Sequence, residues 1–303
     1  MAFEIALLAD FLALGLVAQR ALPGERSRRR AWNAFFFTLS PAVVFYAFTT
    51  IPLDRRLGLA LAAAILASWL TIALGYAYAR LVSRERDERG ALALAAAFPN
   101  TGFLGYPLAQ MALGHPGLAL MVIYDRLAWL VPSSAISTTI ARLHGRRGEG
   151  PGTRRRLRAL LANPPLIAAL AAISLRLAGV DAAGVSEPLG HAAGAAIGPA
   201  GFFLLGFNLP LEPIEHGRDE LRRAAGALAI RFAGGPALLL ASGAAIGAEI
   251  PAAFYLGAAM PCAFHLLILA RAFDVRPRLM RLLVIGSTVP AVIAVVGATA
   301  MLR

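Results

Sequence analysis

Lysine is absent from this sequence, and charged residues of any kind make up only 15% of its 303 residues. Soluble domains carry about 25% charged residues and about 45–50% apolar ones. Here 58% of the residues are hydrophobic. The shortage of charge argues against an ordinary soluble domain and favours a helical membrane protein that crosses the bilayer several times.

Cysteine is nearly absent as well. The single Cys262 excludes an intrachain disulfide and a metal site of the CxxC kind, and we expect it to be inert packing. The sequence also lacks a GxSxG, HExxH or Walker motif and a nucleotide domain. We therefore expect neither an enzyme nor a nucleotide-driven pump, and no cofactor or metal. The first 20 residues are no convincing signal peptide, because acids precede the arginines, and we expect a retained spanning helix.

What the sequence does contain is a series of apolar stretches separated by arginines. A spanning helix needs about 20 mainly apolar residues, and ten candidate segments are present. They cover residues 2–20, 33–52, 57–80, 90–112, 117–142, 163–179, 189–210, 223–247, 250–271 and 279–302.

The arginines orient these segments. Of 29 arginines, 23 lie in the odd-numbered loops, four lie on the opposite side, and Arg126 and Arg231 fall inside segments. By the positive-inside rule the odd loops are cytoplasmic and both termini are extracytoplasmic. We expect Arg231 to snorkel to the cytoplasmic surface. The net charge of +12 is therefore explained by arginines in cytoplasmic loops, and nucleic acid is not an expected partner. Arginine-only basicity with abundant Ala, Leu and Gly indicates a GC-rich bacterial genome, and hence a bacterial inner (plasma) membrane.

A basic, glycine-rich loop at residues 144–162 divides the chain into residues 1–143 and 163–303, each with five segments. Because five is odd, the second set must cross the membrane in the opposite sense to the first. The predicted fold is therefore an all-α integral membrane protein with ten transmembrane helices in two inverted five-helix repeats.

Proline spacing agrees with this repeat. Pro99 lies 98 residues after Met1, and Pro261 lies 98 residues after Asn163, where the second half begins. Broken segments at equivalent positions of two inverted halves are typical of transporter binding sites. We therefore expect broken helices 4 and 9 to cross at the membrane midplane.

The fourth segment is broken twice. Pro99 and Pro107 interrupt Ala91–Leu113, and each proline should free a carbonyl four residues earlier, those of Ala95 and Phe103. In lipid an unsatisfied group of this kind costs several kcal/mol. We therefore expect the breaks to have a function that offsets this cost.

Residues at the first break are candidate substrate ligands. The amide of Asn100 offers donors and acceptors, and the backbone N–H groups of Thr101 and Gly102 would face an anion at the start of the second half-helix. The alternative for Asn100 is a simple helix cap. We expect Gly105 at the crossing, although both glycines could instead serve close helix packing.

Three titratable residues inside segments are candidates for ion coupling. His265 could line the site or carry a proton, or its neutral ring could bond to a carbonyl. Asp125 could carry the coupling proton or interact with the crossing. The alternative is a structural ion pair with Arg231, or a bond to another buried donor, because Arg126 should point about 100° away around the helix. Asp10, in the middle of the first segment, could take part in coupling or bond to a helix end.

Several motifs together resemble a known family, the auxin efflux carriers, which include the plant PIN carriers. The motifs are AFPNTGFLGYP, LSPAVVFYAF, NPPLIAAL, GPAGFFLLGFNL and GSTVPAVIAV. The resemblance implies a scaffold of helices 1, 2, 6 and 7 and a moving transport unit of helices 3–5 and 8–10, with substrate bound beside the crossing of helices 4 and 9. The architecture is similar to that of bile acid:sodium symporters. One departure is His265, where the family often has an asparagine.

These observations lead to three functional hypotheses. The first is a secondary active or facilitative transporter that moves a small organic anion, an auxin-like or dicarboxylate molecule, by elevator-type alternating access. The second is a sodium- or proton-coupled symporter or antiporter of the related fold, with H⁺ or Na⁺ as coupling ion. The third is a non-transporting membrane sensor. The expected partners are the anion and membrane lipid, and the oligomer considered is a homodimer.

Overall fold

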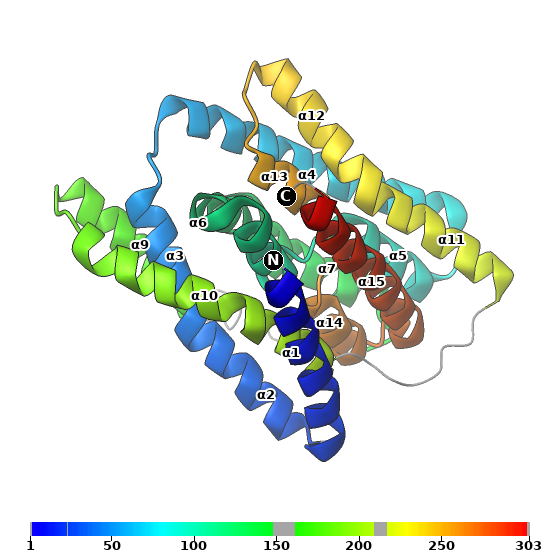
Figure 1. Ribbon diagram of the computed structural model, residues 1–303. Coiled ribbons are helices and arrows are strands. Elements are labelled where there is room, and N and C mark those ends of the chain that lie inside the picture. Colours follow the sequence, from blue (N-terminus) through cyan, green and yellow to red (C-terminus); the bar gives the residue numbers. More distant parts are fainter. Residues whose placement is uncertain (1, 23, 148–160, 209–216, 302–303) are drawn as a thin grey trace.

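The computed structural model describes residues 2–22, 24–147, 161–208 and 217–301 (Figure 1). Within these ranges all regular structure is helical, and no strand is present. Most of the predicted loop at residues 144–162 lies outside the described residues. The first half contains α1 (Ala2–Ala21), α2 (Glu25–Ala34), η1 (Phe35–Leu39), α3 (Ser40–Thr50), α4 (Arg55–Val82), α5 (Arg86–Ala97), η2 (Thr101–Gly105), α6 (Tyr106–Tyr124), η3 (Asp125–Trp129), η4 (Pro132–Ile136) and α7 (Ser137–His144). The second half contains α9 (Pro164–Leu177), α10 (Ala183–Asn208), α11 (Arg218–Ala229), η5 (Ile230–Gly234), α12 (Gly235–Ile246), α13 (Ala252–Ala258), α14 (His265–Phe273) and α15 (Pro277–Met301).

The described helices support an integral membrane protein. Five are long and apolar enough to cross a membrane, and a sixth span results if Thr101–Trp129 and Pro132–His144, bent by 51°, count as one. Each of the ten predicted segments is largely helical. Several are too short to span alone, such as α9 with 14 residues, or are broken, as between α13 and α14. The number of ten spans therefore stays a prediction.

A glycine separates the fourth and fifth predicted segments. Helical geometry runs through α6 except at Gly114, whose φ of 70° and ψ of −165° break it. Such a positive φ is accessible mainly to glycine. The chain thus turns where the sequence predicted a short loop.

The helices form two groups on either side of α6 (Figure 1). In one group α1 packs on α10, and α3 packs on α9 and α10; in the other α4 packs on α5 and α12. The contact between α1 and α10 is close enough for backbone to meet backbone at Gly15 and Gly206. Small residues allow such approaches between membrane helices.

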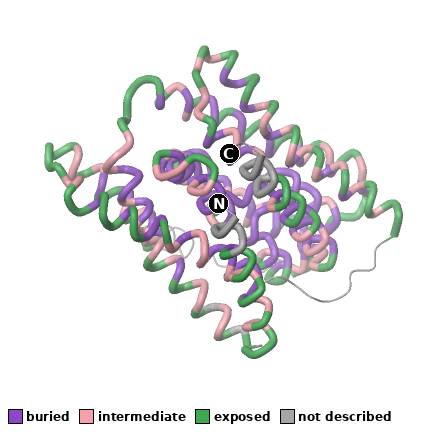
Figure 2. The backbone as a smooth tube through the Cα atoms, in the orientation of Figure 1, coloured by how far each residue is buried: buried purple, intermediate pink, exposed green. Residues whose placement is uncertain are grey.

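The core surrounds the broken helices. Nearly all of residues 90–97 of α5 are buried, so this half-helix is enclosed on every side. Figure 2 shows the buried backbone concentrated in the middle of the molecule, with exposed turns on the surrounding helices. Many exposed side chains there are large and apolar, such as Leu81 and Ile293. Such a surface suits contact with lipid.

Ion pairs join the ends of several helices near the start of α5. Arg223 of α11 donates to Glu88 (2.9 Å), and Arg276, just before α15, lies 3.5 Å from Asp87 and 3.4 Å from Glu220. The sequence pattern around Glu220 suggests a solvated acidic surface, but Glu220 takes part in this cluster. Two of its acidic neighbours in the sequence, Glu212 and Glu215, lie outside the described residues.

The contact between α1 and α10 generates a stability prediction. A Cβ at Gly15 would lie 2.2 Å from the carbonyl oxygen of Phe203 and 2.8 Å from the amide nitrogen of Phe207. Backbone atoms cannot yield as side chains do, so Gly15→Ala should destabilise the protein by about 1–3 kcal/mol. Thermal melting in detergent measures the loss. Gly184→Ala is the matched control, because its Cβ would meet nothing within 4 Å; equal melting of both variants would contradict the packing.

Candidate functional site

The two broken helices meet at their breaks and pair like two antiparallel strands around Pro99. The backbone N–H of Asn100 donates to the carbonyl of Pro261 (2.7 Å), and the N–H of Ala263 donates to the carbonyl of Phe98 (2.9 Å). Each break thus supplies the hydrogen-bond partners that the other lacks. The predicted proximity of the two breaks is observed in the chain.

The carbonyls that the prolines should free find different environments. That of Ala95 accepts the thiol of Cys262 (3.2 Å). Cys262 is therefore a hydrogen-bond donor, where the sequence suggested inert packing. The carbonyl of Phe103 faces α10. A Cβ at Gly201 of α10 would lie 2.7 Å from this carbonyl oxygen and 2.9 Å from the ring of Pro107. The second break is thus in close contact with a helix of the other group.

Arg231 is wholly buried, and the prediction that it snorkels to the surface is wrong. Its two terminal nitrogens donate to the carbonyls of Ala97 and Ala258. These residues end α5 and α13, the half-helices that lead into the two breaks. The residue lies in the π-helical turn η5, and such turns are frequent at functional sites.

A cavity of about 280 Å³ lies beside the crossing. Its walls come from both breaks, from η3 and η4, and from α2 and η1. The lining residues are Trp32, Phe36, Pro99, Asn100, Thr101, Gly102, Phe103, Asp125, Arg126, Trp129, Leu130, Ser133, Ser134, Ala263, Phe264 and His265.

Asn100 caps a helix start and also carries an unpaired group. Its Oδ1 accepts the backbone N–H of Phe103 (3.3 Å) and so caps the start of η2. Its Nδ2 is buried and has no hydrogen-bond partner among the described residues. The same holds for Nε2 of His265. Buried polar atoms are nearly always paired, so two unpaired ones on residues that line one cavity point to a ligand.

Asp125 is the centre of a hydrogen-bond network. Its carboxylate accepts the hydroxyl groups of Thr101 and Tyr106 (2.6 Å for Tyr106) and pairs with Arg126. The sequence argument against this pair is therefore wrong, and so is the alternative pair with Arg231. Two physical reasons explain the error. The helix widens into the π-helical turn η3 at Asp125, and the long arginine side chain bends back over its neighbour.

The remaining predicted site residues divide into two sets. Gly102 lines the cavity, and a Cβ there would meet nothing within 4 Å. Gly105 lies in the crossing, where its Cβ would be 3.3 Å from the sulfur of Met121 and 3.5 Å from Met260. Asp10 lies exposed on α1 and does not line this cavity. It is not brought together with the others.

Sequence reasoning missed Arg126, Tyr106 and the aromatic side of the cavity. The ring of Phe103 stacks between Trp32 (centroids 4.2 Å apart) and Phe35 (4.9 Å). A signal for Arg126 was available, since an arginine inside an apolar segment is itself a candidate for function. Nothing local in the sequence indicated the stack, because Trp32 and Phe103 lie far apart along the chain.

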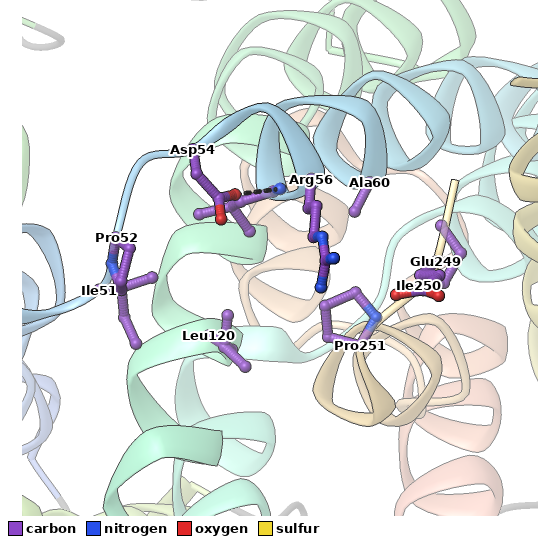
Figure 3. A pocket seen from close by; sticks show the side chains of 10 residues that line it. Ile51, Pro52, Asp54, Arg56, Ala60, Leu120, Glu249, Ile250 and Pro251 are labelled. Atoms are coloured by element: carbon purple, nitrogen blue, oxygen red, sulfur yellow. Dashed lines mark hydrogen bonds between the residues drawn. The ribbon is translucent and has the colours of Figure 1, made fainter. Parts of the chain in front are cut away.

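A second and larger cavity of about 450 Å³ lies elsewhere, between the α3–α4 and α12–α13 connections (Figure 3). Asp54, Arg56 and Glu249 line it, and Asp54 is engaged in capping α4 through the N–H of Leu57 (2.8 Å). No predicted site residue lines this cavity. The crossing cavity is therefore the better candidate site.

Apolar helices around two broken ones, with a cavity at the breaks that holds polar side chains between apolar walls, are typical of one class of protein, the integral membrane transporters. Comparison with known families agrees. The model of the family described as membrane transport protein matches residues 7–150 and 153–298, and the chain belongs to that family. The resemblance to auxin efflux carriers is confirmed, and membership of this family supports a transporter rather than an enzyme.

One curated relative is a protein of Methanothermobacter thermautotrophicus described as an uncharacterized transporter. It is 30% identical to this chain over 143 residues, which are 47% of the chain and 45% of the relative. The match thus spans less than half of the relative's length.

The network at Asp125 generates a prediction. Thr101→Val removes one donor to a buried carboxylate and should lower the free energy of unfolding by about 1–3 kcal/mol. Thr101→Ser keeps the hydroxyl and serves as the control. Thermal melting of the two purified variants in detergent measures the difference. If valine proves as stable as serine, the hydroxyl does not support Asp125.

Proposed function

We propose that the protein carries a small organic anion with a carboxylate group, bound in the crossing cavity. One observation supports this most directly: Asn100 and His265, which carry the unpaired Nδ2 and Nε2, line the same cavity as Arg126. An amide N–H and a guanidinium are natural donors to a carboxylate. The first turn of η2 begins here as well, and helix N-termini favour anions.

The walls of the cavity favour an aromatic carboxylate among the candidate substrates. Trp32, Phe36 and Phe103 line it on one side, and Trp129 and Phe264 line it as well. Aromatic rings gain free energy by stacking with their centroids about 4.5–7 Å apart. An auxin-like acid thus matches both the donors and the walls, whereas a non-aromatic dicarboxylate matches the donors alone.

The predicted ten-helix inverted repeat gains support at the crossing. Pro99 and Pro261 lie 162 positions apart, and so do Asp125 and Ser287. Asp125 binds the hydroxyl of Thr101 beside the first break, and Ser287 accepts the backbone N–H of Cys262 (3.1 Å) in the second. Equivalent positions of the two halves thus hold equivalent breaks.

We infer an elevator motion of the helices that carry the crossing against α1, α3, α9 and α10. Contacts of α6 with α3 and α10 lie between the moving helices and the fixed ones. The stacking of Phe103 on Trp32 would change as one group slides past the other. In a bacterial inner membrane with the odd loops in the cytoplasm, Trp32 lies on the cytoplasmic side, and the cavity would open inward.

A second candidate function is proton-coupled transport through Asp125. This carboxylate is buried, lines the cavity and forms an ion pair with Arg126. An incoming anion would compete for the same guanidinium. Protonation of Asp125 would release Arg126 to the anion, and with a bound monoanion the net charge of the site would stay unchanged. Anion and proton would then move together.

Asn100→Asp tests the anion site without removing the helix cap, because aspartate caps as well as asparagine. Loss of the Nδ2 donor and the added negative charge should weaken anion binding by roughly 10- to 150-fold, the equivalent of about 1.5–3 kcal/mol. The probe is radiolabelled phthalate, an aromatic dianion, with malonate as the non-aromatic comparison. Uptake is measured in proteoliposomes against protein-free liposomes.

Asn163→Asp is the matched control, because Asn163 caps α9 in the same way (3.1 Å to the N–H of Leu166) and does not line the cavity. Normal phthalate uptake by Asn100→Asp would overturn the assigned role of Asn100. Saturable phthalate binding without uptake in either direction would instead favour a non-transporting sensor.

The coupling proposal predicts that a pH gradient with the more acidic side outside the liposomes drives phthalate uptake. Both compartments are kept above neutral pH so that the probe stays ionised. Asp125→Asn should leave a phthalate flux that no longer responds to the gradient, because the amide cannot take up the proton. If phthalate uptake by the unchanged protein does not depend on the pH gradient, coupling to protons is excluded and the mechanism is facilitated diffusion.

A further inference from the structure

The crossing creates two kinds of helix end with opposite electrostatic character. Helix N-termini begin at η2 and α14, beside the cavity, and helix C-termini end at Ala97 and Ala258 on α5 and α13. The C-terminal carbonyls of a half-helix are negative and are the groups that bind a coupling cation in transporters with broken helices. Such a cation site is therefore expected at Ala97 and Ala258.

A guanidinium occupies this position. The two terminal nitrogens of Arg231 donate to the carbonyls of Ala97 and Ala258, one nitrogen to each. The residue is 0% exposed, and its partners are carbonyls rather than a carboxylate. One side chain of η5 thus joins the C-terminal ends of both half-helices.

The charges balance without a further ion. Each helix C-terminus carries about half a negative charge, so the two ends together match the single positive charge of the guanidinium. A second cation at these carbonyls would add an unbalanced buried charge, which is costly.

The local sequence leaves room for this guanidinium. A Cβ at Gly235, one turn after Arg231, would lie 2.5 Å from its Nη2 and 2.9 Å from the carbonyl oxygen of Ala258. A glycine is therefore required where the arginine meets the end of α13. At the neighbouring Gly234 a Cβ would make only ordinary contacts, the nearest at 3.4 Å.

We propose that Arg231 is a tethered cation that takes the place of a free coupling cation at the C-terminal carbonyls of the two half-helices. The site is thereby closed to Na⁺. If the chain carries anions as proposed above, their transport is independent of sodium, and the second hypothesis keeps only its proton-coupled form.

Chemical rescue tests this role without any organic anion. Arg231→Ala opens a space lined by two unpaired carbonyls, and free guanidinium, far below the concentrations that unfold proteins, should bind there. The melting temperature of the purified variant in detergent is measured in choline chloride with added guanidinium or Na⁺. We expect guanidinium to raise it saturably by several degrees and to leave the unchanged protein unaffected. Exchange of choline for Na⁺ should not shift the unchanged protein either.

Arg176→Ala is the matched control. Arg176 also donates to helix-end carbonyls, those of Phe48 (3.2 Å) and Ile51 (2.6 Å), but it is only half-buried. Its removal leaves an open surface that water fills, so guanidinium should not restore the melting temperature. If guanidinium rescues both variants alike, Arg231 does not mark a specific site. The proposal is also overturned if neither guanidinium nor Na⁺ raises the melting temperature of Arg231→Ala. Stabilisation of the unchanged protein by Na⁺ over choline would also overturn the proposal.

Two glycine variants keep the proposal testable if Arg231→Ala does not fold. Gly235→Ala should displace the guanidinium and lower the melting temperature, whereas Gly234→Ala should not. Equal melting of the two would contradict the proposal. Because these readouts need no transport, a chain that binds guanidinium in Arg231→Ala but moves no phthalate would refute the proposed function and keep this inference.

Discussion

In a bilayer every backbone polar group needs a partner within the protein, and this constraint governs the centre of the fold. Two breaks in apolar helices expose N–H and C=O groups, and the structure satisfies them by pairing the breaks with each other. The bonds from Asn100 to Pro261 and from Ala263 to Phe98 do this on both sides of the crossing. The ends of the half-helices, the cavity and the buried Arg231 all take their positions from this pairing.

The sequence predicted this centre well because breaks in apolar segments are conspicuous. Prolines mark the breaks, and matching intervals in the two halves relate Pro99 to Pro261. What pattern alone could not provide was the direction of long side chains. Arg126 bends back to Asp125, and Arg231 turns inward, because both lie in π-helical turns that regular 3.6-residue geometry does not describe. The stack of Phe103 on Trp32 depends on tertiary contact between distant segments.

Asn100 illustrates why capping and binding need not be alternatives. A side-chain amide has two ends, and the helix start uses only the oxygen. The cap holds the side chain in one orientation and leaves the nitrogen without a partner among the described residues. A hydroxyl cap would lack the second group, and a carboxylate cap would repel the anion proposed for the site. The residue type is thus explained by both demands together.

The mutual pairing of the breaks also bears on the assembly of the protein. Pro99 leaves the ribosome 162 residues before Pro261. Until the second break is made, the first has no backbone partner, and α5 cannot close its end against α13. The helices before the second break are therefore an incomplete folding unit even after insertion, and contacts distant in sequence complete them late. A chain interrupted before Pro261 would retain an open break at its centre.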